Sequence, residues 1–343
     1  MAAKRDNGPL LDVQDLNVSI PTSSGELTVA RGISYQVWPG ETLAIVGESG
    51  CGKSLSSLAL IGLQPRRAKV SAVRCRFDGQ DLLSLDAKQM TDLRGTKLAM
   101  IFQDPMTSLN PVYTIGDQLA EVYTCHGLGT KRDAVDRATF LLERVGIKNA
   151  AVRLGQYPHQ LSGGLRQRVV IAMAMMCSPK LIIADEPTTA LDVTVQAVIL
   201  GLLKELQDEF GMALVLITHD LGVVASVSDR VAVMYAGRIM ETGATDQVFN
   251  SPTHPYTQGL LDCIPRADGR GKGTRLHTIP GMVPSLVGRI DGCAFRNRCS
   301  RVVPACATGE IAVRSDTQGH DYRCVHPGDR LLADWRVRAE APV

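Results

Sequence analysis

Short apolar runs separated by polar turns dominate the first hundred residues of the chain. Runs rich in β-branched and apolar residues predict strands, and the polar stretch from Pro21 to Gly25 and the turn from Trp38 to Glu41 separate the first three. Asp78-Gly79 marks a further turn. The expected strands are residues 10–20, 27–37, 42–46, 73–77 and 98–102. The first two are expected to be antiparallel and to lead into a buried strand at 42–46.

The pattern changes from strands to helices between Asp104 and about Gln160. Periodic stretches such as residues 133–145, punctuated by glycines, predict an inserted helical subdomain at about 104–178. The alternative is that these are further helices of one domain. Beyond this region, buried strands are expected at 181–184 and 213–218, and an apolar stripe from Val195 to Phe210 predicts an amphipathic helix between them.

Composition limits the classes of protein that fit this pattern. The 343 residues suffice for one large α/β domain with a smaller one, or for two domains, and a hydrophobic content of 45% is ordinary for a globular chain. A net charge of +2, with scattered basic residues, gives no reason to propose nucleic acid as a partner. The start has no apolar signal region, and segments such as Met212 to Ile217 are far shorter than a bilayer span. We therefore expect a soluble, cytosolic chain.

The strand at 42–46 leads directly into a phosphate-binding pattern. Gly47, Gly52, Lys53 and Ser54 fill the spacing G-x-x-x-x-G-K-S, and an apolar-periodic helix follows. In this context the glycines let backbone N–H groups close on phosphate oxygens, Lys53 reaches the terminal phosphates and the Ser54 hydroxyl ligates Mg²⁺. The nucleotide-binding residues expected here are Gly47, Glu48, Ser49, Gly50, Cys51, Gly52, Lys53, Ser54 and Leu55.

A Ser-Gly-Gly turn opens a second chemical centre. Ser162 is a candidate N-cap, and Gly163 and Gly164 leave backbone N–H groups bare at the start of a helix, where an anion can bind. Taken alone, however, such a turn is more often only a helix cap.

Two adjacent carboxylates end the apolar run that begins at residue 181. The carboxyl edge of an α/β sheet is where ligands bind, so Asp185 is expected to hold Mg²⁺ through water, and Glu186 to orient or deprotonate an attacking water. His219 follows the next predicted strand, near the same edge. A lone histidine is more often structural than catalytic.

These pieces, taken in order, resemble the nucleotide-binding subunit of ATP-binding cassette (ABC) transporters. The resemblance covers residues 10 to about 250 and rests on the motifs GESGCGKS, FQDP, LSGGLRQ, LIIADE, TTALD and ITHD. It implies that Gln103 is a further nucleotide and Mg²⁺ ligand, that Asp192 belongs to the D-loop and that His219 stabilises the γ-phosphate. Ser162, Gly163 and Gly164 would then contact ATP held by a second ATPase subunit.

The sequence departs from the family pattern at two positions. Leu165 stands where the signature commonly has glutamine, and Ile20 falls near the position of the adenine-stacking aromatic. Losing that aromatic forfeits about 1 kcal/mol, which bears on nucleotide affinity and base selectivity rather than on catalysis.

The late region resembles the C-terminal extension of oligopeptide and dipeptide importer ATPases. It carries the segments HPYTQGLL, IPGMVPSL and GCAFRNRC and four clustered cysteines, while the other five of the nine are dispersed. Four thiolates fit a [4Fe–4S] cluster or a zinc ion, and four reduced cysteines are a further alternative. The spacing lacks the C-x2-C knuckle usual for zinc, and relatives of this branch associate such a quartet with an iron–sulfur cluster, which we favour. The quartet is Cys293, Cys299, Cys306 and Cys324.

We expect an α/β P-loop ATPase with an antiparallel edge sheet (residues 10–250), a small C-terminal extension (251–330) and a tail (331–343). The resemblance implies that it powers import of peptides or a similar solute at the cytoplasmic face of a bacterial inner membrane. Two integral-membrane permease subunits, a second ATPase and, indirectly, a solute-binding protein would be its partners. One alternative is a soluble ABC-type ATPase acting on nucleic acid or ribosomes. Another, a non-hydrolysing regulatory partner, is disfavoured by the intact Lys53, Glu186 and His219.

Overall fold

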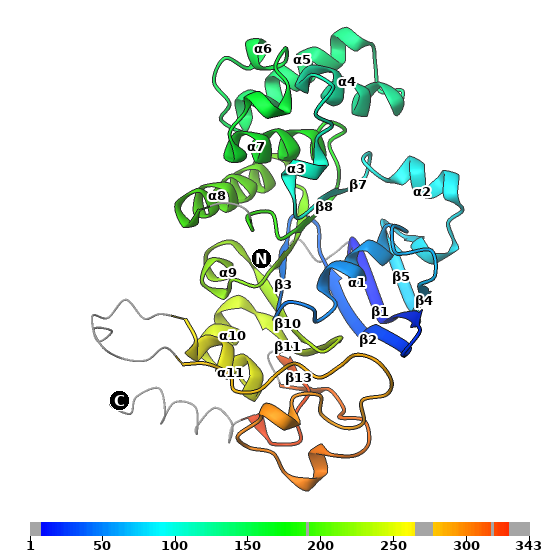
Figure 1. Cartoon of the computed structure of the whole chain (residues 1–343), viewed down its shortest axis with the longest axis vertical. Coiled ribbons are helices and arrows are strands. Elements are labelled where there is room, and N and C mark those ends of the chain that lie inside the picture. The colour runs from blue at the N-terminus through cyan, green and yellow to red at the C-terminus, as the bar shows by residue number, and fades with distance from the viewer. Residues whose placement is uncertain (1–7, 190–191, 265–276, 317–318, 329–343) are drawn as a thin grey trace, which may run out of the picture. The chain divides into compact units, whose positions relative to one another are not determined.

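The computed structural model describes residues 8–189, 192–264, 277–316 and 319–328 (Figure 1). The chain divides into two compact units. The first unit contains the chain up to Leu11, Val37–Thr42 and Arg76–Ile217, and the second contains Asp12–Gln36, Leu43–Cys75 and the chain from Thr218 onward.

The first unit is built on three parallel strands, β7 (Leu98–Ile101), β8 (Leu181–Asp185) and β9 (Ala213–Thr218). All five residues of β8 and all six of β9 are buried, as expected for parallel strands covered on both faces. A short hairpin of β5 (Arg74–Phe77) and β6 (Gln80–Asp81) turns at Asp78 and Gly79, both with positive φ. The strands predicted at 73–77, 98–102, 181–184 and 213–218 and the turn at Asp78-Gly79 are therefore confirmed.

Helices occupy the chain between β7 and β8 (Figure 1). Side-chain caps fix where they begin. Thr114 accepts a hydrogen bond from the Asp117 N–H, and Thr130 forms a capping box with Asp133. The helices of this stretch are α3 (Pro105–Ser108), α4 (Ile115–Cys125), α5 (Lys131–Arg144), α6 (Ala150–Arg153) and α7 (Gly163–Ala174), with a 3-10 turn, η3 (Pro158–Gln160).

Three further helical elements belong to the first unit. They are η2 (Leu82–Ser84), α2 (Ala87–Leu93) and α8 (Val193–Phe210). The α8 helix is the amphipathic helix predicted at 195–210, and it ends at Gly211, whose positive φ of 67° provides the left-handed cap that glycine favours.

The second unit contains parts of two sheets. In one, β1 (Leu11–Thr22) lies beside β2 (Gly25–Val37) and pairs antiparallel with β4 (Lys69–Ser71). In the other, β3 (Thr42–Val46) runs parallel to β10 (Arg230–Tyr235), which pairs antiparallel with β11 (Arg238–Ala244). The two short strands β12 (Arg314–Ser315) and β13 (Asp321–Tyr322) extend this sheet beyond β11.

The helices of the second unit are short. They are α1 (Lys53–Leu60), α9 (Leu221–Val227), α10 (Thr245–Asn250) and α11 (Pro255–Asp262), with the 3-10 turns η4 (Arg296–Arg298) and η5 (Pro304–Cys306). None of the helices within the described ranges of the chain has the length and apolar character needed to cross a bilayer.

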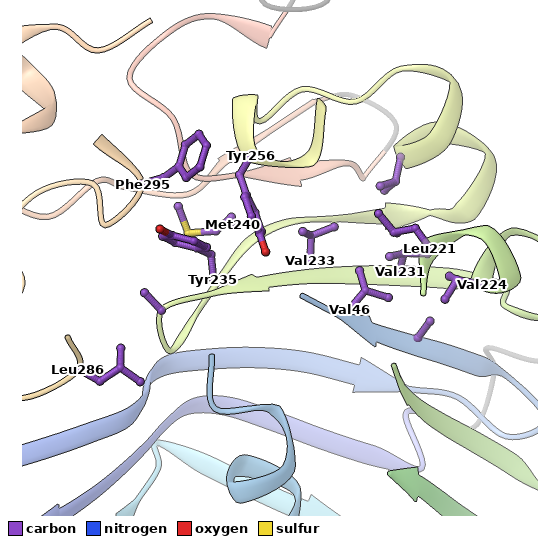
Figure 2. Close-up of a cluster of buried hydrophobic side chains, with 13 residues drawn as sticks. Val46, Leu221, Val224, Val231, Val233, Tyr235, Met240, Tyr256, Leu286 and Phe295 are labelled. Carbon is purple, nitrogen blue, oxygen red and sulfur yellow. The ribbon is translucent and has the colours of Figure 1, made fainter. Parts of the chain in front are cut away.

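The late segment packs onto the rest of the second unit through one apolar core. Val46 and Val233 from the sheet lie in the same cluster as Tyr256 of α11 and Phe295, as Figure 2 shows. Backbone hydrogen bonds add to this packing, because the Thr28 N–H donates to the Leu286 carbonyl at 2.9 Å. Tyr256, Leu286 and Phe295 of the late segment are thus part of the hydrophobic core of this unit.

A buried carboxylate ties the same segment to β11. Glu241 is fully buried, and its Oε1 accepts hydrogen bonds from the Thr253 N–H at 2.6 Å and from His320 Nε2 at 2.7 Å. Its Oε2 accepts from the His254 N–H at 2.9 Å. Burial opposes the charged form of His320, but the hydrogen bond and the charge of Glu241 outweigh it and raise the pKa of His320.

Candidate functional site

The predicted phosphate-binding loop joins β3 to α1 in the second unit. Lys53 is the first residue of α1 and is 4% exposed. Its Nζ donates hydrogen bonds to the carbonyls of Gly47 at 2.7 Å and Glu48 at 3.1 Å. The loop therefore curls around the ammonium group, and Ser54 follows as the second residue of the helix.

At two positions of the loop, Gly47 and Gly52, a backbone carbonyl of a neighbouring strand lies so close that no side chain fits. A Cβ at Gly47 would lie 2.1 Å from the Met234 carbonyl oxygen, and one at Gly52 would lie 1.9 Å from the Val29 carbonyl oxygen. Both distances are far inside van der Waals contact. Only glycine fits between the loop and strands β2 and β10.

Two residues of the late segment also hold the loop, a contact that the sequence did not predict. Tyr256 accepts a hydrogen bond from the Glu48 N–H at 3.1 Å, and Arg298 forms an ion pair with the Glu48 carboxylate at 2.9 Å. No local sequence signal links Tyr256 or Arg298 to Glu48, because each of them lies more than 200 positions from it. The contacts come from the fold of the late segment.

The acidic pair of the first unit lies at the end of β8. Asp185 is 5% exposed and Glu186 is 9% exposed. Glu186 has a φ of 44°, a left-handed conformation that is uncommon for a residue with a side chain, and its N–H donates to the Ile217 carbonyl at 2.9 Å. Strained backbone of this kind is concentrated at functional sites.

Two neutral side chains hold the Glu186 carboxylate. Gln103 Nε2 donates to Glu186 Oε2 at 3.3 Å, and the Thr189 hydroxyl donates to the same oxygen at 2.9 Å. The structure thus brings together Gln103 and Glu186, which were assigned to the site separately. Thr189 was missed, although its place three residues after Glu186, in the turn that follows the strand, is a signal that would have found it.

Ser162 and Asp192, which belong to two of the predicted motifs, each cap the start of a helix. Ser162 is the N-cap of α7, where its Oγ accepts from the Leu165 N–H at 3.4 Å, and Gly163 and Gly164 form the first turn. Asp192 caps α8 by accepting from the Val195 N–H at 3.0 Å. Of the D-loop motif, Ala190 and Leu191 lie outside the described residues.

The remaining two predicted nucleotide contacts lie in the second unit. His219 is exposed directly after β9, and Ile20 is half-buried on β1. Ile20 has no aromatic face to offer a base.

The four late cysteines line one small cavity in the second unit. Cys306 and Cys324 are buried, Cys293 and Cys299 are half-buried, and Phe295 forms part of the wall. Burial, reinforced by the negative charge of the other three thiolates, raises the pKa of Cys293 to about 11. Among the residues that the structure describes, no three His, Cys, Asp or Glu side chains lie close enough together to hold a single metal ion.

Comparison with known proteins identifies the family. Residues 30–189 match the family described as ABC transporter, and residues 240–306 match the oligopeptide/dipeptide transporter C-terminal region. The dipeptide transport ATP-binding protein DppD of Bacillus subtilis is 51% identical over 319 residues, which cover 92% of this chain and 94% of that protein. The chain belongs to the ABC transporter family. DppD of Escherichia coli is 48% identical, over 93% of this ABC protein and 97% of its own length.

Solved structures agree with this assignment. The ATP-binding cassette MJ0796, solved as a dimer bound to ADP and Pi, matches with a TM-score of 0.60 and 26% identity over 68% of this chain and 98% of its own. The cbiO1 protein from Clostridium perfringens matches with a TM-score of 0.61 and 30% identity over 70% of this chain and 90% of its own. The predicted fold class and family resemblance are confirmed.

Proposed function

We propose that this ABC protein is the ATP-hydrolysing subunit of an importer for oligopeptides or dipeptides. The observation that carries the proposal is the similarity to dipeptide transport ATP-binding proteins along 92% of the chain, which includes the cassette and the late segment together. Relatives named for peptide import favour this function over action on nucleic acid or ribosomes.

Each residue of the predicted motifs has its own role in the proposed hydrolysis. Lys53 and the amides from Gly47 to Gly52 bind the phosphates. Ser54, Gln103 and, through water, Asp185 would hold Mg²⁺, which would supply positive charge to neutralise the phosphates. Glu186 orients and deprotonates the attacking water, and His219 stabilises the transferred phosphoryl group.

Glu186 is suited to this role by its hydrogen bonds. Its carboxylate is buried, and it accepts hydrogen bonds from the side chains of Gln103 and Thr189. The same two donors also fix the orientation of the carboxylate.

A second ATPase subunit completes the proposed site. The Ser162 hydroxyl and the N–H groups of Gly163 and Gly164 lie at the start of α7, where backbone N–H groups without partners inside the helix favour an anion. In the dimer these residues and Asp192 would contact the ATP held by the partner's phosphate-binding loop.

The domain organisation we propose follows the motifs. Residues 10–250 form the ATPase domain with its helical subdomain at about 104–178, and residues 251–330 form the extension, while 331–343 lie outside the described residues. The importer would also contain two permease subunits and a solute-binding protein, with this chain bound peripherally at the cytoplasmic face of the inner membrane.

We further propose that Cys293, Cys299, Cys306 and Cys324 hold a [4Fe–4S] cluster. Four thiols around one cavity match the ligand set of such a cluster, and their mutual repulsion as thiolates would be relieved by bound iron. When bound, the cluster would cross-link the extension.

The cluster proposal has a direct test. Anaerobically purified protein should contain iron and acid-labile sulfide, and Cys306→Ser should lose both. Cys125→Ser, at an exposed cysteine outside the quartet, is the control and should retain them. Stoichiometric zinc without iron would contradict the proposal.

The transport function is tested by uptake of a labelled dipeptide into cells that lack this gene. Wild-type protein should restore uptake, and Lys53→Ala, which removes the phosphate-binding ammonium group, should not. Uptake that does not depend on the gene would overturn the proposed function.

A further inference from the structure

Arg298 reaches from the late segment to the phosphate-binding loop. It is the last residue of η4 and directly precedes Cys299, but its side chain is not part of the cysteine cavity. Its Nη1 lies 2.9 Å from Glu48 Oε1 and 3.0 Å from Glu48 Oε2. The side chain of Arg298 is 5% exposed and that of Glu48 is 29% exposed, so water screens this ion pair only in part.

The guanidinium group is fixed by further contacts. Its Nε donates to the Pro280 carbonyl at 3.0 Å and its Nη2 to the Ile279 carbonyl at 3.1 Å. Its central carbon lies 5.8 Å from the ring centre of Tyr235, and Nη1 is 3.4 Å from the hydroxyl of the same residue. These contacts, together with the ion pair to Glu48, hold the guanidinium group in one place.

Backbone hydrogen bonds connect Glu48 to Tyr256 and to Lys53. Its N–H donates to the Tyr256 hydroxyl, and its carbonyl accepts from Lys53 Nζ. Tyr256 and Tyr235 pack against each other with ring centres 4.6 Å apart, in the core that Figure 2 shows. Arg298 thus holds the side chain of Glu48, and Tyr256 holds its backbone.

The ion pair also matters for ligand binding, because Glu48 carries a negative charge in a loop that binds phosphates. A carboxylate in a loop that binds a polyanion repels that ligand, and the repulsion is strong where water is partly excluded. Arg298 neutralises the carboxylate and keeps it turned toward the late segment.

We propose that Arg298 is a positioning residue for nucleotide binding, which acts through Glu48 to neutralise and fix the phosphate-binding loop. The inference rests on the proposed role of that loop. The turn that carries Arg298 lies between Cys293 and Cys299, so the conformation of the cysteine segment sets the ATP affinity of the loop.

The test measures the affinity of the full-length protein for Mg-ATP, with a fluorescent ATP analogue as the probe. Arg298→Gln should raise the Kd about tenfold or more, because it leaves the carboxylate unpaired. Arg298→Lys keeps the charge and loses the planar fork, so its Kd should rise about threefold to tenfold. Arg289→Gln is the matched control on the same segment, since the Arg289 side chain is 86% exposed, and it should bind as wild type.

A double-mutant cycle separates this mechanism from simple loss of structure. If the unpaired charge is what weakens binding, adding Glu48→Gln to Arg298→Gln should restore part of the affinity. Unchanged affinity in folded Arg298→Gln would overturn the proposal, as would a double mutant whose loss equals the product of the two single losses. If Arg298→Gln does not fold, wild-type affinity in Arg298→Lys overturns it.

Lys53→Ala distinguishes the inference from the function on which it rests. Undiminished ATP affinity in Lys53→Ala would refute the binding site itself. A loss in Lys53→Ala together with no effect at Arg298 would refute only the positioning role.

Discussion

Replacing Gly52 with alanine should destabilise the protein far more than the same change at Gly50. Both glycines have positive φ, 101° and 78°, so alanine costs about 1–2 kcal/mol of conformational energy at either position. At Gly50 nothing lies within 4 Å of the added Cβ, whereas at Gly52 it would lie 1.9 Å from the Val29 carbonyl oxygen. Overpacking of this kind adds about 1–3 kcal/mol.

Thermal unfolding of the two variants measures the difference. One kcal/mol corresponds to about 2–4 °C in a domain of this size, so Gly52→Ala should unfold about 2–12 °C below Gly50→Ala. The clash is with backbone inside a strand, which cannot rotate away as a flexible side chain would. Equal unfolding temperatures would refute the close approach of the loop to β2.

Three further substitutions test other parts of the structure. Glu241→Gln should lower the free energy of unfolding by about 2–4 kcal/mol, because an amide group would face a buried donor. Thr189→Ala should lower kcat for ATP hydrolysis and leave ATP affinity unchanged, because it removes one of the hydrogen bonds that orient the Glu186 carboxylate. Asp78→Asn should cost about 1 kcal/mol at neutral pH by removing the ion pair with Lys180. That difference should disappear in acid, because the hydrogen bond from Lys180 lowers the pKa of Asp78 below 3.8 and its stabilisation is lost as the pH falls through the lowered value.

Each of these three has a control and a contradicting result. The control for Glu241→Gln is Glu310→Gln, at a carboxylate that is 71% exposed, and it should change the free energy of unfolding by less than about 0.5 kcal/mol. An equally small change in Glu241→Gln would contradict the burial of Glu241 in a hydrogen-bonded site. A change in ATP affinity without a change in kcat would contradict the role given to Thr189. An Asp78→Asn difference that persists below the lowered pKa would show that the turn, and not the charge, is responsible.

The elements that the sequence predicted are those whose signal is local. Strands β3, β8 and β9 are continuous apolar runs, and α8 carries its apolar stripe over five turns, so their burial can be inferred from the sequence alone. The phosphate-binding loop is also local, because its glycines and its lysine lie within eight residues. These elements form where the pattern places them.

What the sequence did not predict depends on contacts between distant segments. The short strands β4, β12 and β13 have no periodicity of their own and form by adding to an existing sheet edge. The ion pair of Arg298 with Glu48 joins residues 250 positions apart.

The proposed role of Glu186 is decided by comparing ATP binding and ATP hydrolysis in Glu186→Gln. Turnover should be abolished while ATP affinity stays at the wild-type value, because the amide cannot deprotonate water and the phosphate-binding loop is untouched. Hydrolysis at a rate near that of the wild-type protein would contradict that role.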